Sequence, residues 1–405
     1  MSRPEALVPV PDVDPGTAGP PCAYARLRAE QPVVQAQLPN GETGWLISRY
    51  EDVRAAFADP RLVRPLLSAW PPREGADAPP PALPTFLEMT GEHHERVRRA
   101  VLPMFGRRQL EFMRPRIRAM AGELVDAMVA GTADGEAADL VTSYAEPLPL
   151  RVLRETVGLP YEDREIYLPH TLTLLGASGL SMEEVLAALY ALQGLRRRPR
   201  LPPGEGPRGR GLHRAAPDGS TPPGWLTEPG RRHQLRRHHA HGGLQDQPSS
   251  TPATPCSRCS PVPDQLRRLR EAPEGIGTAA EELLRYVPLM NAINILVATE
   301  DFTLHGQRIR AGAAVVPVPA SANRDPEQFV DADHLDLART PNAHVAFGHG
   351  PHSCMGGHLT RLQLAIAIEV LLERLPGIEL AVPAGTIPWD ESTPLRAPAV
   401  LPVRW

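Results

Sequence analysis

The alternation of apolar and polar residues predicts short strands and longer helices over the first 130 positions. Four short elements are predicted before residue 60, namely a helix at Tyr24–Glu30, strands at Val33–Ala36 and Gly44–Ser48, and a helix at Tyr50–Ala58. Residues 64–85 are rich in proline and are predicted to form a long loop. Residues 92–130 have helical periodicity, with arginine-rich and apolar faces.

Helices dominate the pattern in the rest of the chain. The helical pattern continues through three further segments, Leu140–Val157, Glu162–Leu175 and Ser181–Leu195. It resumes at Asp264, and residues 355–375 are predicted to form one long amphipathic helix with a single apolar side. Residues 293–318 alternate like strands around a turn at Leu304–Gln307. These patterns predict a mainly α fold with a small β portion, and the length allows one large domain or two or three small ones.

The segment 196–262 has a different composition. From Arg196 to Pro261 the chain holds one aromatic residue, Trp225, and no Ile, Val, Phe, Tyr or Met. Arg, Pro, Gly, His and Ser dominate there. A segment of this kind cannot bury a helix face and is typical of disordered chain.

Charge and composition exclude several classes of protein. The net charge of -4 is too small to indicate a nucleic-acid partner, and no apolar run reaches membrane-spanning length. The first residues lack the features of a signal peptide, so a cytoplasmic location is expected. Four cysteines are too few for a disulfide scaffold in 405 residues. All 43 basic residues are arginine, which indicates GC-rich coding DNA.

The strongest chemical signal is the stretch from Phe347 to Gly356, which reads FGHGPHSCMG. Its cysteine, Cys354, stands where the long C-terminal helix is predicted to begin. Free backbone N–H groups and the positive end of the helix dipole favour a thiolate there. The surrounding glycines allow a flat ligand to lie against the backbone. A structural cysteine in a glycine-rich turn is the alternative interpretation.

This stretch resembles the haem-binding loop of cytochromes P450, FGxGxHxCxG, and matches it at every fixed position. The resemblance implies the cytochrome P450 fold in one domain spanning residues 1–405, with haem b as cofactor and Cys354 as the axial ligand of the iron. It also places Phe347, Gly348, His352 and Gly356 in the cofactor site. A thiolate on haem iron pushes electron density toward bound dioxygen and helps to cleave the O–O bond.

A second signal is the pair Glu282 and Arg285, which are three positions apart and share a helix face. Most such pairs are exposed and contribute little. Their position before the cysteine resembles the family's ExxR motif, which implies a buried structural ion pair. The family usually completes this network with an arginine after a segment like 323–326. His334 stands at what looks like the corresponding position, so the sequence does not identify the third member.

A third signal is the pair His94 and Arg98, which lie on one helix face. They resemble the family's helix that binds the haem propionates, where cations offset two carboxylates. An ordinary charged helix face is the alternative. His352 resembles a further propionate contact. The family often has one more arginine in the strand after the ExxR helix, where this chain has Leu296, which implies one haem contact fewer and weaker haem retention.

The resemblance implies a monooxygenase that hydroxylates or epoxidises a small apolar molecule with O2. Electrons would come from NAD(P)H through a ferredoxin and its reductase, and the protein is expected to be a monomer. Bacterial relatives often act in natural-product biosynthesis, such as that of polyketides and antibiotics. The family fold implies a substrate pocket lined by residues 64–90, Leu289–Ile295 and Pro394–Val400. Five arginines could form a basic surface for the ferredoxin or an ordinary solvated face, namely Arg96, Arg99, Arg107, Arg108 and Arg361.

The distal side of the site is not identified by the sequence. The family has a long helix there, with an acidic or amide residue followed by threonine, and residues 196–262 hold no such pattern. The catalytic residues therefore stay unassigned. Codons for His239–Gln247 read one base later permit a similar motif, so part of this segment is hypothesised to be translated in a shifted frame. The alternatives are a disordered insertion and a zinc site at Cys256 and Cys259 with nearby histidines.

Two other functions remain open from the sequence. If the segment 196–262 is translated as given, the chain is expected to be a catalytically silent haem-binding or partner-stabilising protein. A peroxide-driven oxygenase would need no ferredoxin. A supply of peroxide alone distinguishes this second function from a ferredoxin-dependent monooxygenase.

Overall fold

The computed structural model describes eight ranges, namely 7–11, 20–38, 41–65, 88–133, 135–157, 262–287, 295–389 and 398–405. Several predictions lie outside these residues. They are the helices at Glu162–Leu175 and Ser181–Leu195, nearly all of the segment 196–262 with its shifted-frame motif and cysteines, and most of the proline-rich loop and the proposed pocket lining. In the parts of the chain that are described, no helix is both long and apolar enough to cross a bilayer.

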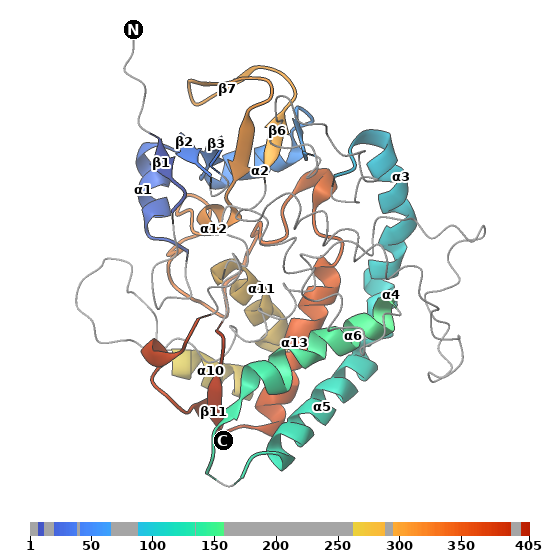
Figure 1. Cartoon of the computed structure of the whole chain (residues 1–405). Helices are drawn as coiled ribbons and strands as arrows, with labels where there is room; N and C mark the ends of the chain where they lie inside the picture. Colours follow the sequence, from blue (N-terminus) through green and yellow to red (C-terminus); the bar gives the residue numbers. More distant parts are fainter. Residues whose placement is uncertain are drawn as a thin grey trace.

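A six-stranded sheet stands at one end of the molecule, at the top of Figure 1. Its strands, in spatial order, are β1 (Val8–Pro9), β2 (Val33–Gln37), β3 (Thr43–Ile47), β9 (Ala314–Pro317), β6 (Leu296–Ala298) and β4 (Leu62–Val63). Successive side chains of a strand point to opposite faces. Accordingly, Trp45 and Val315 belong to one buried cluster, whereas Leu46 and Val316 belong to another. Both faces of the sheet are therefore buried at its centre.

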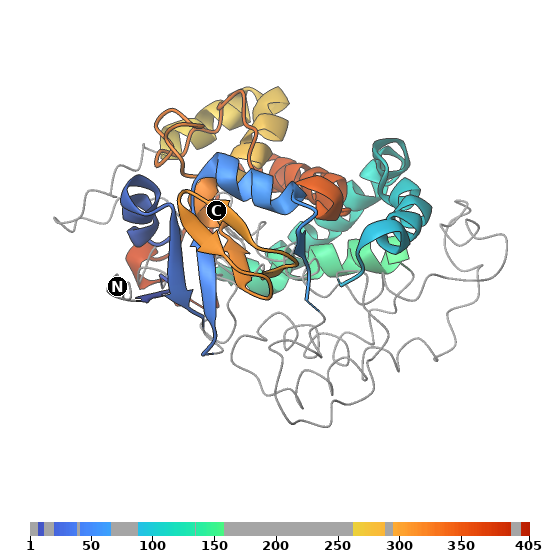
Figure 2. The same ribbon diagram turned by 90° about the horizontal axis from the view of Figure 1, so that it is seen from above.

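One helix covers each face of this sheet. Tyr24 of α1 (Ala23–Glu30) joins the cluster that contains Leu46, and Phe57 of α2 (Tyr50–Ala58) joins the cluster that contains Trp45. The two helices lie on different sides of the strands in Figure 2. The early elements predicted from periodicity are thus confirmed, with bounds that differ by one residue at most.

Two smaller sheets complete the β portion. The predicted turn at Leu304–Gln307 is confirmed, because it joins β7 (Phe302–Leu304) to β8 (Gln307–Ile309) in an antiparallel hairpin. His305 and Gly306 both have positive φ in this turn, which is the conformation that two-residue hairpin loops favour. The third sheet is formed by three short strands, β10 (Glu379–Leu380), β11 (Pro402–Arg404) and β5 (Ala138–Asp139).

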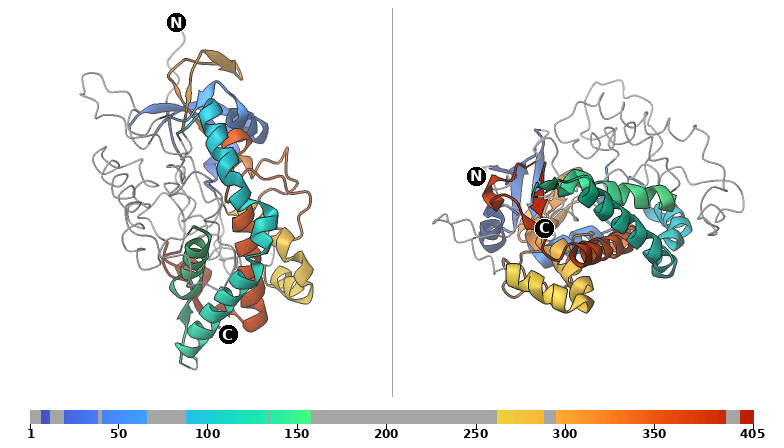
Figure 3. Two further views of the ribbon diagram at one scale, coloured as in Figure 1. Left: turned by 90° about the vertical axis from the view of Figure 1, so that its right-hand side faces the viewer. Right: turned by 90° about the horizontal axis from the view of Figure 1, so that it is seen from below.

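The helical body occupies the other end of the molecule. Its central helix is α13 (Gly357–Arg374), which packs against α5 (Arg114–Ala130) and α11 (Ile276–Tyr286), as Figure 3 also shows. Helix α13 is amphipathic, as predicted, but its exposed side is narrow. Most of its less buried residues follow one stripe, namely His358, Arg361, Ala365, Glu369 and Glu373. The other sides pack against several partners and are buried, including the polar Gln363. Two further helices belong to this body, α6 (Pro147–Val157) and α10 (Val262–Glu271).

The helical pattern at residues 92–130 is not one helix. It is divided into α3 (Gly91–Val101), a 3-10 turn (Leu102–Phe105), α4 (Arg107–Glu111) and α5. Pro103 lacks a backbone N–H, and Gly106 has an extended backbone, so the chain turns at both places. Other short helical segments are a π-helix at Val141–Ala145, α12 at Pro319–Ala322, and 3-10 turns at Pro273–Gly275, Gly350–His352 and Ala384–Thr386.

Candidate functional site

Cys354 lies in a tight loop immediately before α13. Its backbone N–H donates to the carbonyl oxygen of Phe347 at 2.8 Å, and the N–H of Gly357 donates to the carbonyl of Cys354 at 3.3 Å. The helix begins at Gly357, so the cysteine stands just outside the helix rather than within its first turn. It is partly exposed and belongs to no disulfide. We call residues Phe347–Gly356 the Cys loop.

Two glycines shape the Cys loop, because Gly348 and Gly350 both have positive φ, at 69° and 70°. A β-carbon on Gly350 would lie 2.8 Å from the carbonyl oxygen of Phe57 and 3.0 Å from the Cα of Ala58. The loop is therefore in close contact with the end of α2. A β-carbon on Gly348 would meet nothing within 4 Å, so open space borders the loop there.

Replacement of Gly350 by alanine is expected to lower the free energy of unfolding by more than the cost of the left-handed backbone conformation alone. A left-handed non-glycine residue costs about 1–2 kcal/mol, and the clash with Phe57 adds about 1–3 kcal/mol of overpacking. Gly306 is the matched control, since it has a similar positive φ of 78° and open space around its Cα. Urea denaturation of both alanine variants measures the difference. Equal losses of unfolding free energy in the Gly350 and Gly306 variants would show that the contact of the Cys loop with α2 is not tight.

Helix α3 is bound to the Cys loop by three contacts. The rings of His94 and His352 stack with their centroids 4.0 Å apart, and Nη2 of Arg98 donates to Oγ of Ser353 at 3.1 Å. Met355 lies in a buried cluster that includes residues of α3 and its approach, namely Met89, Val97, Val101 and Phe105. The structure thus brings His94 and Arg98 of α3 next to His352 and Ser353 of the Cys loop.

The charges around the two stacked rings are positive. Burial, followed by the charges of Arg98 and Arg64, lowers the pKa of His94 to about 4. Burial, then His94, Arg64 and Arg98, lowers the pKa of His352 to about 3. Both rings are therefore neutral near pH 7. The positive charge comes from Arg98 and Arg64, which together favour the binding of an anion. We call His94, Arg98, His352 and Arg64 the cationic cluster.

Arg64 was not identified from the sequence. It stands at the edge of the proline-rich loop, and a single arginine there belongs to no motif. Besides burial, its charge lowers the pKa of both His94 and His352, and it directly follows β4, which pairs with β6. Leu296, at the position where the sequence led us to expect an arginine, is 5% exposed and packs in the sheet core.

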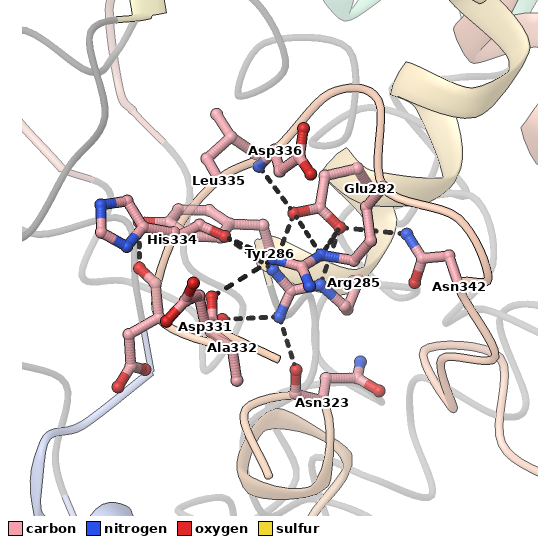
Figure 4. Close-up of polar contacts among 12 residues, drawn as sticks. Glu282, Arg285, Tyr286, Asn323, Asp331, Ala332, His334, Leu335, Asp336 and Asn342 are labelled. Atoms are coloured by element: carbon pink, nitrogen blue, oxygen red, sulfur yellow. Dashed lines mark hydrogen bonds and ion pairs between the residues drawn. The ribbon is translucent and has the colours of Figure 1, made fainter. Parts of the chain in front are cut away.

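The pair Glu282 and Arg285 is buried in α11, with both side chains 0% exposed. Two hydrogen bonds of 2.7 Å join Nε and Nη2 of Arg285 to the two carboxylate oxygens of Glu282. Figure 4 shows how backbone groups complete the network. Arg285 donates to the carbonyl oxygens of Asn323, Ala332 and His334, and Glu282 accepts from the N–H of Asp336 and the amide of Asn342.

The third member of this network, which the sequence left unidentified, is Arg339. Nε of Arg339 donates to both carboxylate oxygens of Glu282, at 3.2 and 3.1 Å, and its side chain is 10% exposed. His334 contributes only its backbone carbonyl, to Arg285 and to Arg339. Arg339 lies five positions after His334 in the sequence. The segment between the two residues is irregular, so counting residues from a motif does not identify Arg339.

A second polar network connects α11 with the Cys loop and α13. Glu281 accepts from Arg361 at 2.6 Å and contacts Nε2 of His344 at 3.0 Å, and the guanidinium of Arg361 lies 4.6 Å from the ring centre of Phe347. Burial alone would raise the pKa of Glu281, but the hydrogen bonds from His344 and Arg361 lower it to about 2. Arg361 is therefore engaged within the fold, whereas the other four arginines of the expected basic surface are exposed, namely Arg96, Arg99, Arg107 and Arg108.

Comparisons with known proteins agree with this geometry. The family model for cytochrome P450 matches residues 278–383, which include Glu282, Arg285 and the Cys loop. The chain is 38% identical to mycinamicin IV hydroxylase/epoxidase of Micromonospora griseorubida over 392 residues, and 37% identical to nocardicin C N-oxygenase of Nocardia uniformis subsp. tsuyamanensis over 391 residues. Each alignment covers 94% of both chains.

Solved structures give the same result. The mixed-function P450 MycG aligns with a TM-score of 0.74 and 35% identity, over 99% of this chain and 100% of that one. The structure of CYP105P1 in complex with filipin I aligns with a TM-score of 0.79 and 28% identity, over 99% of each chain. Because the similarity extends over nearly the whole of both chains, the chain belongs to the cytochrome P450 family and is one of its monooxygenases.

Proposed function

We propose that the chain transfers one oxygen atom from O2 to a small apolar substrate, by hydroxylation or epoxidation, in the biosynthesis of a natural product. Several relatives are named for steps of this kind, such as mycinamicin IV hydroxylase/epoxidase and nocardicin C N-oxygenase. The observation that carries the proposal is the convergence of a partly exposed cysteine and the cationic cluster at the Cys loop.

The donor set at the Cys loop fits haem. Cys354 offers a thiolate for iron, the cationic cluster offers groups for two carboxylates, and the open space beside Gly348 suits a flat ring. Phe347 and Gly356 delimit the loop that would hold the metal. When bound, haem would supply the activation of dioxygen, with Cys354 as the thiolate that would hold its iron.

The buried ion pair positions the Cys loop. Arg285 donates to the backbone carbonyl of Asn323 at 2.7 Å. The side-chain oxygen of Asn323 in turn accepts from the N–H of Val345 at 2.8 Å, two residues before Phe347. Glu282 and Arg285 thereby hold the segment that leads into the loop, without a direct contact to Cys354. We assign them a positioning role.

Electron transfer from NAD(P)H through a ferredoxin and its reductase is part of the proposal. Arg96 and Arg99 on α3 and Arg107 and Arg108 on α4 are exposed. They could attract an acidic partner to the helix that contacts the Cys loop. We place the protein in the cytoplasm, where such carriers operate.

Turnover with labelled dioxygen tests the proposal. The full chain is incubated with NADPH, a surrogate ferredoxin and reductase, and a panel of macrolide and polyketide substrates. We expect a product that carries one labelled oxygen atom, and haem-thiolate ligation in the carbon monoxide difference spectrum. Product formation with peroxide alone would favour the peroxide-driven alternative. A haem-thiolate spectrum without product in either assay would favour the silent haem-binding protein.

A further inference from the structure

We propose that Arg64 binds a haem propionate and replaces the cation that is missing at Leu296. The inference rests on the haem site proposed above and concerns which residues of this chain hold the carboxylates. Leu296 is an apolar residue of β6, 5% exposed, in the same buried cluster as Trp45 and Val315. This position of β6 therefore provides no charge to the site.

The strand register places Arg64 beside that position. Strands β4 and β6 are antiparallel, with Leu62 opposite Ala298 and Val63 opposite Val297. The next step of the same register puts Arg64 opposite Leu296. Residues directly opposite in an antiparallel pair have β-carbons about 4.5–5.5 Å apart. An arginine side chain is long enough to reach, from the neighbouring strand, the space that a cation at Leu296 would occupy.

Electrostatics connect Arg64 to the other members of the cationic cluster. Its charge acts on both His94 and His352, which belong to α3 and the Cys loop. Three separate segments thus contribute nitrogen donors to this cluster. Arg64 and Arg98 contribute positive guanidinium groups, and His352 contributes a neutral ring. Two positive guanidinium groups close together repel each other, and a carboxylate that joins them relieves this repulsion. Arginine suits that partner, since its planar fork can bind a carboxylate through two hydrogen bonds.

Arg61 provides a matched control, because it precedes β4 directly whereas Arg64 follows it. It binds Asp59 through hydrogen bonds as short as 2.7 Å, and its guanidinium lies 4.6 Å from the ring centre of Phe302. It is an arginine three residues before Arg64 that is engaged away from the cationic cluster. A general effect of removing an arginine next to this strand would appear in both variants.

The test measures the rate at which the full-length holoprotein releases haem to apomyoglobin. We expect Arg64→Ala to accelerate release by about tenfold, as for loss of one charge-assisted hydrogen bond. Arg64→Lys, which keeps the charge but loses the planar fork, is expected to accelerate release by less than Arg64→Ala does. Arg61→Ala is expected to release haem at the unchanged rate.

Haem dimethyl ester identifies the carboxylate as the partner. In this cofactor both propionates are esterified, so Arg64→Ala and the starting protein are expected to release it at the same rate. An unchanged release of ordinary haem from Arg64→Ala, or an equal acceleration with the ester, would overturn the inference. A starting protein that shows no haem-thiolate spectrum would instead contradict the proposed haem site, so the two failures are distinguishable.

Discussion

Replacement of Cys354 by serine is expected to remove thiolate ligation and to lower oxygenation by at least on the order of 10³-fold, as when a group that bonds to the reacting centre is removed from other enzymes. Serine is close to cysteine in size, and the loop is fixed by backbone hydrogen bonds such as that from Cys354 N–H to Phe347. The fold is therefore expected to survive. The loss should fall on the chemistry, because a hydroxyl is a far weaker donor of electron density than a thiolate.

The reduced carbon monoxide complex provides the measurement. We expect Cys354→Ser to lose the long-wavelength Soret band that reports thiolate ligation, with an unchanged far-ultraviolet circular dichroism spectrum. Cys22→Ser is the control, since Cys22 is also partly exposed but precedes α1, which packs on the sheet. It is expected to keep both the band and the activity. An unchanged Soret band in Cys354→Ser would show that another residue binds the iron.

Replacement of Arg285 by alanine is expected to prevent stable folding. It leaves the carboxylate of Glu282 buried without its main partner, and loss of one member of a buried ion pair costs about 3–5 kcal/mol. It also removes donors from the carbonyl oxygens of Asn323, Ala332 and His334. Typical domains are stable by only about 5–15 kcal/mol. Most of the variant protein should therefore be insoluble or unfolded, as measured by soluble yield and thermal denaturation.

Two further variants separate the members of this network. Arg339→Ala is expected to destabilise the fold less than Arg285→Ala, because Arg339 is not fully buried and Arg285 stays in place to neutralise Glu282. His334→Ala should keep a melting temperature near that of the starting protein, because His334 takes part through its backbone carbonyl. A normal melting temperature for Arg285→Ala, or a much lower one for His334→Ala, would contradict the roles given to these residues in the network around Glu282.

Local periodicity predicted those elements whose partners lie close in sequence or on one side. Helix α2 and the pair β2–β3 were predicted nearly to the residue. Helix α2 buries one stripe of residues, and the two strands pair with each other across a short connection. The surroundings of α13 could not be predicted, since the helices that bury its several sides come from distant parts of the chain. Periodicity also did not reveal the breaks at Pro103 and Gly106, because the apolar pattern continues across them.

The residues of the candidate site also fall into two groups, those that the sequence identified and those that it missed. Cys354, His94 and Arg98 were predicted because they belong to motifs that resemble a known family. Arg339 was missed because an irregular segment separates it from any fixed count of residues. Arg64 could be found only after the register of β4 and β6 was known. The sequence therefore identified the candidate site residues that belong to motifs. The tertiary structure was needed to find the residues that come near the site only through folding.

The contacts between α3 and the Cys loop have a consequence for synthesis of the protein. Arg98 and Ser353 are 255 residues apart in the chain, yet they are joined by a hydrogen bond. Domains tend to fold as whole units during translation, and a ribosome exposes α3 long before it has made the loop. The nascent chain therefore lacks the Ser353 partner of Arg98 until 255 further residues have been made, so cofactor binding at the Cys loop can only follow synthesis of that loop.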